Sequence, residues 1–278
     1  MTLLAVAVSG RGLVSPDDPV LHADDEALLR GRAAFETLRV YGGHPFRLEQ
    51  HLDRLCASAE RIGLREVDRD TLCALADEAL DAAGEPEAVL RFFWTPGREG
   101  ANAPLALALV STLPPGQDEE RARGLRLATV PSAVSPFLAG VKSTSYAANI
   151  AARDDAARRD ADDALFVGAD GTVLEAPTAN VWFREGRTLH TPTLELPILA
   201  GVTRSVVCEL ATRHDYAVEE GLYPLERLLR ADEAFVCSTV REVVGVVSVD
   251  GETVGAGRPG EAARELELSL RELATARV

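Results

Sequence analysis

The chain has 278 residues, of which 46% are hydrophobic and 26% are charged, a composition typical of a folded protein and far from that of a disordered one. A formal net charge of −15 at pH 7, with no strongly basic patch along the chain, argues against nucleic acid or an anionic membrane surface as the main partner. No apolar stretch reaches membrane-spanning length and no positive segment precedes the first apolar run, so we expect neither a membrane segment nor a signal peptide.

The length favours two domains, each large enough to bury its own core. We expect a small α/β domain over residues 1–113, a linker over 114–124 and a larger domain over 125–278. The linker is predicted because its residues are rich in proline, glycine and charge and lack periodic apolar positions. The predicted fold class is therefore α/β, in the form of a two-domain α+β architecture.

The first domain is predicted to contain both strands and helices. Residues 33–46 alternate apolar and polar side chains on both sides of Gly42-Gly43, which is the pattern of a β-hairpin with a glycine turn. Leu48, Leu52 and Leu55 then recur at helical spacing. In chain order, we expect a strand over 1–12, the hairpin over 33–46, helices over 47–64 and 68–84, and strands over 88–97 and 104–113.

The second domain is predicted to be mixed in the same way. An alanine-rich helix begins just after Lys142, and two hairpins turn at Asp170-Gly171 and Glu185-Gly186. A glycine-led helix follows Pro197. In chain order, we expect a strand over 125–131, a helix over 146–161, hairpins over 164–176 and 180–192, a helix over 200–214, strands over 233–240 and 242–251, and a helix over 261–275.

The cysteines lie far apart among apolar neighbours and show neither a C-x-x-C pair nor a metal-ligand spacing. We therefore expect buried, reduced thiols, no metal site and a cytoplasmic protein. These cysteines are Cys56, Cys73, Cys208 and Cys237.

The 29 basic side chains include a single lysine, Lys142, in the segment AGVKSTSYAAN between a predicted strand and a predicted helix. Arginine stays protonated under ordinary conditions, whereas a lysine amine can lose its proton and act as a nucleophile or a base. The small neighbours Gly140 and Ser143 leave room for a bulky partner. The alternative interpretation is a solvated lysine on the surface.

Further segments contain side chains or backbone groups that could take part in acid–base chemistry or bind an anion. Each also has an alternative interpretation without a function. Glu175 ends an apolar strand, where a carboxylate is either solvated or directed at a cation such as a ring nitrogen that it keeps protonated. The segment LAGVTR over 199–204 begins a helix, whose N–H groups attract an anion, although helices commonly begin this way without one. Ser238 and Thr239 end another strand and offer hydroxyls to the same anion. Arg54 lies within an amphipathic helix, where a charge on the solvent face is the plain interpretation.

Together these side chains suit a phosphorylated aldehyde cofactor, because they include an amine for a Schiff base, an acid for the ring and donors for the phosphate. From about Leu21 to Gly251 the chain resembles the fold-type IV pyridoxal-phosphate enzymes, the class IV aminotransferase family. This family includes branched-chain aminotransferases, D-amino-acid aminotransferases and 4-amino-4-deoxychorismate lyases. The segments that carry the resemblance, in the family's order, are GRAAFETLRVYGGHPFRLEQHLDRL, KSTSYAAN, LEAPTANVWF, LAGVTR and STVREV.

The resemblance implies pyridoxal 5′-phosphate as cofactor and a role for each matching residue. Lys142 is implied to be the Schiff-base residue and the catalytic base, and Glu175 to pair with the pyridine nitrogen. The family also implies a homodimer, with the active site between the two domains. The other residues implied to contact the cofactor are Arg54, Leu199, Val202, Thr203, Ser238 and Thr239.

The resemblance leaves several activities open. The first is an aminotransferase that exchanges an amino group between an amino acid, preferably a D-amino acid, and a 2-oxo acid through a Lys142 aldimine. The second is 4-amino-4-deoxychorismate lyase, which gives 4-aminobenzoate and pyruvate, since GRAAFETLRV and KSTSYAAN resemble lyase segments. A branched-chain L-amino-acid aminotransferase ranks third, because Arg30-Gly31 and CSTV replace that subfamily's usual motifs. The non-enzymatic alternative is a colourless two-domain binding protein.

The substrate carboxylate needs a binding residue that the resemblance does not supply. The segment WTPGREGAN lacks the R-x-H arrangement of the best-known D-amino-acid enzymes, so another guanidinium would have to pair with the carboxylate. The candidates are Arg30, which would act across the dimer interface, and Arg91, followed by Arg98 and Arg241, and the alternative for each is a surface ion pair. Thr37 and Tyr146 are candidate pocket residues.

Overall fold

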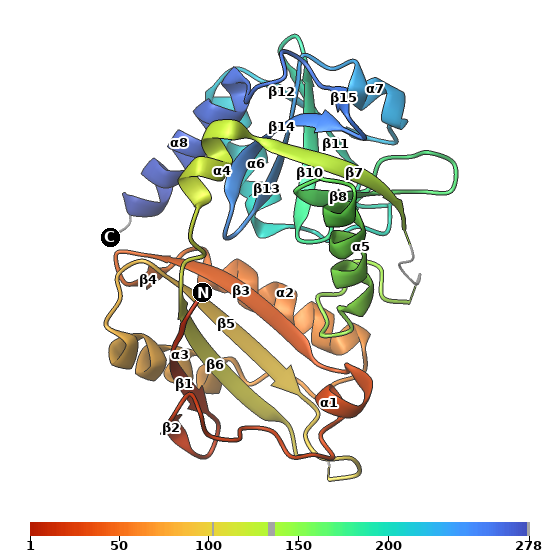
Figure 1. Cartoon of the computed structure of the whole chain (residues 1–278). Helices are drawn as coiled ribbons and strands as arrows, with labels where there is room; N and C mark the ends of the chain where they lie inside the picture. Colours follow the sequence, from red (N-terminus) through yellow and green to blue (C-terminus); the bar gives the residue numbers. More distant parts are fainter. Residues whose placement is uncertain (102, 133–136, 277–278) are drawn as a thin grey trace. The chain divides into compact units, whose positions relative to one another are not determined.

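Two sheets, each with its own hydrophobic core, organise the residues that the computed structural model describes, 1–101, 103–132 and 137–276 (Figure 1). One compact unit comprises Met1–Pro115 and Val141–Tyr146, and the other comprises Gly116–Gly140 and Ala147–Ala276. Both units combine helices with strands, which confirms the predicted α/β fold class. The parts of the predicted domains at residues 102, 133–136 and 277–278 lie outside the described residues.

An antiparallel sheet forms the first unit, with the strand order β2-β1-β6-β5-β3-β4 in the described residues. The turn at Gly42-Gly43 joins β3 to β4, as predicted, with a positive φ at both glycines. The strands are β1 (Leu3–Val8), β2 (Gly12–Val14), β3 (Ala34–Tyr41), β4 (His44–Pro45), β5 (Ala88–Thr95) and β6 (Leu105–Thr112). The helices are α1 (Glu26–Arg30), α2 (Leu48–Arg61) and α3 (Arg69–Ala83).

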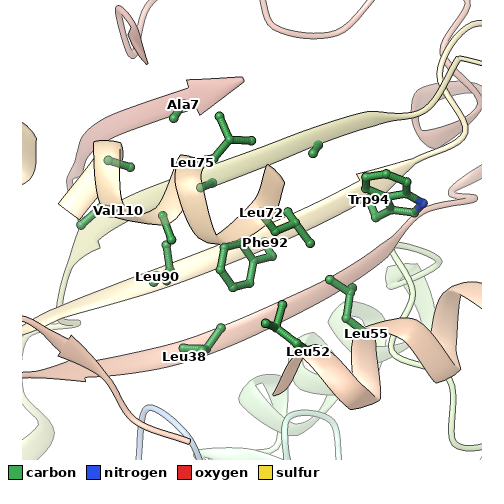
Figure 2. Packing of buried hydrophobic residues seen from close by; sticks show 14 of the residues in the cluster. Ala7, Leu38, Leu52, Leu55, Leu72, Leu75, Leu90, Phe92, Trp94 and Val110 are labelled. Carbon is green, nitrogen blue, oxygen red and sulfur yellow. The ribbon is translucent and has the colours of Figure 1, made fainter. Parts of the chain in front are cut away.

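Alternation along the strands gives this sheet two different faces. One face packs against α2 and α3 and forms a buried core (Figure 2). On the opposite face, Phe35 lies across from Phe93, and Thr37 lies across from Arg91 in the register of β3 and β5. The core includes Leu38, Leu90 and Phe92 from the strands and Leu52, Leu55, Leu72 and Leu75 from the helices. The face without these helices therefore brings two of the predicted substrate residues next to each other.

A mixed sheet forms the second unit, with the strand order β12-β11-β10-β13-β14-β7-β8 and the short strands β9 and β15 paired to β10 and β14. The pairs β11–β12, β14–β7 and β7–β8 are parallel. The strands are β7 (Leu125–Pro131), β8 (Asp163–Val167), β9 (Glu175–Ala176), β10 (Ala179–Glu185), β11 (Thr188–Pro192), β12 (Ala217–Gly221), β13 (Glu233–Ser238), β14 (Glu242–Val249) and β15 (Glu252–Thr253).

Helices border this sheet at several places. The α6 and α8 helices pack on each other and contact β13 and β14, while α5 packs on β7 and β8. The helices are α4 (Gln117–Arg123), α5 (Ala147–Arg158), α6 (Val202–Arg213), α7 (Leu225–Leu229) and α8 (Glu261–Thr275). The short elements α1, α7, β12 and β15 were not predicted, because segments of two to five residues carry too few positions to show a period.

The structure divides the chain differently from the prediction at two places. The predicted linker over 114–124 contains the helix α4, which begins after Gly116 and ends at Gly124. Val141–Tyr146 belongs to the first unit, although the prediction placed it in the second domain. The reason is a long-range backbone contact, in which Phe35 N donates to Lys142 O (3.0 Å) and Thr144 N donates to Ala33 O (2.9 Å).

The structure also bears on membrane-spanning helices, metal-binding clusters and the burial of the cysteines. No helix in the described residues is both long and apolar enough to cross a membrane. In the same residues, no cluster of three or more His, Cys, Asp or Glu side chains is arranged to hold a metal ion. Cys237 is buried, and Cys56, Cys73 and Cys208 are partly buried.

Candidate active site

Lys142 is held in place by its backbone and lies beside an aromatic ring. Its N–H donates to Ser58 Oγ on α2 (3.1 Å), and its carbonyl accepts from Phe35 N on β3 (3.0 Å). Its Nζ atom lies 4.5 Å from the centroid of the Phe35 ring, within range of a cation–π interaction. The Tyr146 ring packs edge-on against Phe35, with the centroids 5.7 Å apart. The lysine is half-buried and is therefore not the fully solvated side chain of the alternative interpretation.

A buried carboxylate on β3 binds two side chains of α2 near this lysine. Glu36 is completely buried and accepts two hydrogen bonds from Arg54, from Nε to Oε1 (2.7 Å) and from Nη2 to Oε2 (2.8 Å). His51 Nδ1 lies 2.7 Å from the same Oε2. The Arg54 side chain is only 12% exposed, so the interpretation of Arg54 as a charge on the solvent face of the helix is wrong. Glu36 fixes the orientation of the guanidinium, because a bidentate pair restrains both its position and its plane.

Burial and ion pairing together determine the protonation states of the side chains in this cluster. Burial alone would raise the pKa of Glu36, but the charge and hydrogen bonds of Arg54, with the bond to His51, outweigh it and lower the pKa to about 2. Burial lowers the pKa of His51 by more than Glu36 raises it, and the charges of Arg54 and Lys142 lower it further. At neutral pH the cluster therefore contains an ionised carboxylate, a guanidinium and a neutral imidazole.

We expect acidification to destabilise the protein in two stages. The pKa of His51 in the folded protein lies below its ordinary value of 6.5, so below that pH the unfolded chain binds a proton that the folded protein excludes. The pKa of Glu36 falls from 4.5 to about 2 on folding, so the stability from its charge is complete above 4.5 and is lost as the pH falls through 2. Urea unfolding from about pH 8 to pH 4 measures the slope. His51→Gln cannot take up this proton and should flatten the slope between about pH 7 and pH 5, and an unchanged slope would contradict the assignment to His51.

In the second unit, Glu175 is held by hydrogen bonds at the point where β9 turns into β10. Its Oε2 atom accepts from Leu199 N (3.1 Å) and from Asn180 Nδ2 (3.2 Å). Asn180 Nδ2 also donates to Leu199 O (2.9 Å), and only 5% of Asn180 is exposed. Glu175 is thus a fixed acceptor and not a solvated carboxylate at the end of a hairpin.

Two pairings on either side of Glu175 explain this position. The predicted hairpin over 164–176 forms around Asp170-Gly171, because Val167 bridges Val173, Gly168 N donates to Thr172 O (2.8 Å) and Leu174 N donates to Phe166 O (3.0 Å). A two-residue connection after Ala176 then folds β9 back along β10, so that Glu175 lies opposite Asn180. Asn180 in turn lies opposite Cys237 of β13, directly before Ser238. Neighbouring strands therefore place Glu175, Asn180 and the Ser238-Thr239 segment in one region.

Gly201 has no room for a side chain. A Cβ atom at this position would lie 2.0 Å from Asn180 Oδ1 and 3.2 Å from Arg204 Cβ. The φ angle of Gly201 is −68°, which any residue adopts, so the requirement for glycine is steric. The close approach connects the start of α6 to the asparagine that holds Glu175.

We expect Gly201→Ala to cost roughly 1–3 kcal/mol of stability, because the added methyl group must displace the Asn180 amide or the start of α6. Urea unfolding measures the loss. If the steric clash with Asn180 is the cause, Gly201→Ala should lower the free energy of unfolding much less in an Asn180→Ala background. Equal losses of stability in the two backgrounds would contradict this explanation.

The first backbone N–H groups of α6 are suited to bind an anion. Gly201 precedes the helix and provides no side-chain cap for the first N–H groups. Val202 and Thr203 follow and are 7% and 8% exposed. The helix has 12 residues, so its dipole adds to the attraction of its N–H groups for a negative charge.

The arginines proposed for the substrate have very different environments. Arg30 forms an ion pair with Glu99 on the surface, where their side chains are 56% and 53% exposed. Arg98 pairs with Asp24 on the surface, and Arg241 pairs with Asp163 and Glu120. Arg91 is partly buried, donates from Nη2 to Met1 Sδ (3.4 Å), and has no carboxylate partner in the described residues. Burial lowers the pKa of Arg91, which means that its charge is not fully compensated.

The predicted residues are distributed over both units, and several supporting residues were not predicted. The first unit contains Arg30, Thr37, Arg54, Arg91, Lys142 and Tyr146. The second unit contains Glu175, Leu199, Val202, Thr203, Ser238 and Thr239. The supporting residues that sequence reasoning missed are Phe35, Glu36, His51 and Ser58, and it gave no role to Asn180 and Gly201, although it used the segments that contain them. The local pattern did contain one signal, an acid and an amide five residues apart across a turn, as in Glu175 and Asn180.

Comparisons with known proteins find similar sequences and structures over most of the chain. Residues 33–249 match the class IV aminotransferase family (Amino-transferase class IV). A bifunctional aminodeoxychorismate lyase / D-amino acid transaminase from Mycobacterium tuberculosis is 32% identical over 266 residues, which are 89% of this chain and 92% of that protein. A D-alanine aminotransferase from Bacillus licheniformis is 26% identical over 274 residues, which are 96% of each protein.

A solved structure has the same fold across nearly the whole chain. A hypothetical aminotransferase from Mycobacterium tuberculosis, in a PLP-bound form, has a TM-score of 0.89 and 31% identity, over 97% of this chain and 98% of that one. The family match covers well over half of the sequence. The chain therefore belongs to the class IV aminotransferase family, the pyridoxal-phosphate-dependent transaminases of fold type IV.

Proposed function

We propose that the protein transfers the amino group of a D-amino acid to a 2-oxo acid, with pyridoxal 5′-phosphate held by Lys142. The observation that carries the proposal is the setting of this single lysine, half-buried, anchored through its backbone to Ser58 and Phe35, and with its amine over an aromatic ring. Of the basic side chains of this sequence, only a lysine amine can lose its proton under ordinary conditions, and a nucleophile or base requires this.

The described residues of the second unit fit this cofactor. Glu175 is a carboxylate held by an amide and a backbone N–H, as an acid directed at a ring nitrogen would be. The start of α6 carries no side-chain cap, so its backbone N–H groups suit a phosphate, with the hydroxyls of Ser238 and Thr239 as further donors. Leu199 supports the ring in this proposal. In the first unit, Arg54 is the guanidinium for the phosphate, and its bond to Glu36 uses Nε and Nη2.

The side chains of this protein would then divide the proton chemistry between them. When bound, the cofactor supplies an aldehyde for the substrate amine and an electron-poor ring that draws electrons from the broken Cα–H bond. Lys142 Nζ would remove the substrate's Cα proton, for which the amine has to be neutral, and the ammonium formed in this way would later return a proton. Glu175 would keep a proton on the ring nitrogen.

Arg91 is the residue that we propose for the substrate carboxylate. It is a partly buried cation without an acidic partner in the described residues, and such a group favours an anionic ligand. Thr37 lies opposite Arg91 and offers a hydroxyl to the same substrate, and Tyr146 lies near Lys142 against Phe35. Arg30 is the weaker candidate, because Glu99 already neutralises it on the surface.

A second candidate function is 4-amino-4-deoxychorismate lyase. It is favoured by the M. tuberculosis relative, whose name gives both the lyase and the D-amino acid transaminase activity. The same lysine and ring serve both reactions, so the residues described above are compatible with each. A branched-chain L-amino-acid aminotransferase remains third.

A direct comparison of substrates tests the proposal. The purified protein is incubated with D-alanine or D-glutamate and 2-oxoglutarate or pyruvate as acceptor, and separately with aminodeoxychorismate. Amino exchange with the D-amino acid, and much less with L-leucine or L-valine, is the expected result. Formation of 4-aminobenzoate without amino exchange would reverse the order of the two candidates.

We also propose that the protein is a homodimer. The helix α1 supports this, because Leu28 and Leu29 are 63% and 51% exposed and lie directly before Arg30. The mass in solution, measured by light scattering at several concentrations, tests it.

A further inference from the structure

The helix α4 makes side-chain bonds to three consecutive residues where the turn between β13 and β14 leads into β14. Gln117 Nε2 donates to Val240 O (2.8 Å), and Glu120 Oε1 lies 3.1 Å from Arg241 Nε. Arg121 Nη2 donates to Glu242 Oε2 (2.7 Å). In Figure 1 the helix lies beside β14, the strand that this turn begins. The segment predicted to be a linker therefore binds the residues that directly follow Ser238 and Thr239, the proposed phosphate ligands.

The bonds come from one face of the helix. Gln117, Glu120 and Arg121 are spaced i, i+3 and i+4, which places them on the same side. These positions are partly buried, whereas Asp118 and Glu119 between them and Ala122 after them are exposed. The helix thus has one face of solvated side chains and one face of side chains that bind the turn.

The turn has a conformation that needs support. Glu242 has a φ of 63°, in the left-handed region that a residue with a side chain rarely adopts. Its carboxylate is completely buried and accepts hydrogen bonds from Arg121 of α4 and from Arg271 Nε of α8 (2.9 Å). Arg241, the preceding residue, pairs with Asp163 of β8 as well as with Glu120. The path of the chain after Thr239 is therefore determined by bonds from outside the turn.

We propose that Gln117, Glu120 and Arg121 are positioning residues that hold the Ser238 and Thr239 hydroxyls in place for the cofactor phosphate. This inference rests on the proposed function, because it takes the turn to be a phosphate contact. The helix itself touches no cofactor atom in this proposal and acts only through Val240, Arg241 and Glu242. Its effect should therefore appear in the binding of the phosphate group and not in the binding of the aldehyde.

The test compares two ligands and two matched variants. Gln117→Met keeps the length of the side chain and removes its N–H donor, and Glu119→Met places the same group on the exposed side of α4. The dissociation constants of pyridoxal 5′-phosphate and of pyridoxal, which lacks the phosphate, are measured by absorbance for the purified protein. We expect Gln117→Met to weaken pyridoxal 5′-phosphate binding about tenfold and pyridoxal binding hardly at all, with Glu119→Met unchanged for both.

A double-variant background separates positioning from plain stabilisation. In the Ser238→Ala/Thr239→Ala protein, Gln117→Met should no longer change the dissociation constant of pyridoxal 5′-phosphate, because the hydroxyls it positions are absent. A Gln117→Met protein with lower stability to urea but an unchanged dissociation constant would overturn the proposal, as would an equal weakening of both ligands. If Ser238→Ala/Thr239→Ala alone has no effect, the turn is not the phosphate contact and the inference fails, although the enzyme function stands. Failure of the unmodified protein to bind pyridoxal 5′-phosphate at all would instead contradict the proposed function.

Discussion

Lys142→Ala should reduce turnover by about 10⁴-fold or more and should leave a protein that borohydride cannot fix to pyridoxal 5′-phosphate. Lys142 is the only lysine of the chain, so no other side-chain ε-amine can replace its nucleophile and base. The free energy of unfolding should change little, because the backbone bonds of residue 142 to Ser58 and Phe35 do not involve the side chain. Steady-state kinetics, absorbance and mass spectrometry after borohydride reduction measure these effects.

Lys142→Arg is the matched control for this prediction. It keeps a cation that can lie over the Phe35 ring, but a guanidinium does not lose its proton and cannot act as base or nucleophile. We expect the arginine variant to be as inactive as the alanine variant and as stable as the unmodified protein. Turnover within tenfold of normal in either variant would rule out the assigned chemistry of Lys142.

Glu36→Gln should destabilise the fold by roughly 3–5 kcal/mol, because it removes the carboxylate from a largely buried ion pair with Arg54. The neutral amide also cannot accept both guanidinium bonds and the contact with His51 as well as a carboxylate does. Urea unfolding at neutral pH measures the difference. A change below about 1 kcal/mol would show that the pair is not a significant part of the stability of the first unit.

A double substitution distinguishes the structural role of this pair from its proposed role in phosphate binding. Glu36→Leu/Arg54→Met removes both charges and fills similar volume, and should recover most of the stability lost in Glu36→Gln. It should nevertheless bind pyridoxal 5′-phosphate more weakly than the unmodified protein, because no guanidinium is left at position 54. Normal affinity in the stable double variant would remove Arg54 from the cofactor site.

Much of the fold follows from local pattern. The hairpin at Gly42-Gly43 and the helices α2, α3 and α8 were predicted because apolar residues recur at the period of each element. Gly84 ends α3 in the left-handed conformation that glycine adopts without strain, as its position after the last apolar residue indicated. Lys142 and Glu175 were singled out because their residue type departs from their surroundings, and the family match extends over the motifs that contain them.

The sequence by itself therefore determined the fold class, the family and the residues that are able to act as nucleophile, base or ligand. These depend on composition, on the period of the apolar residues and on short motifs. The tertiary structure alone decided which of these groups are buried and what they bind. Arg54 pairs with Glu36, which is 18 residues away, and Glu175 is held by Leu199, which is 24 residues away. From the sequence Arg30 is the first candidate and Arg91 the second, but in the described residues Glu99, 69 residues from Arg30, pairs with Arg30. Such partners meet only when distant segments pack, because burial and charge pairing are properties of the folded neighbourhood and not of any local stretch of chain.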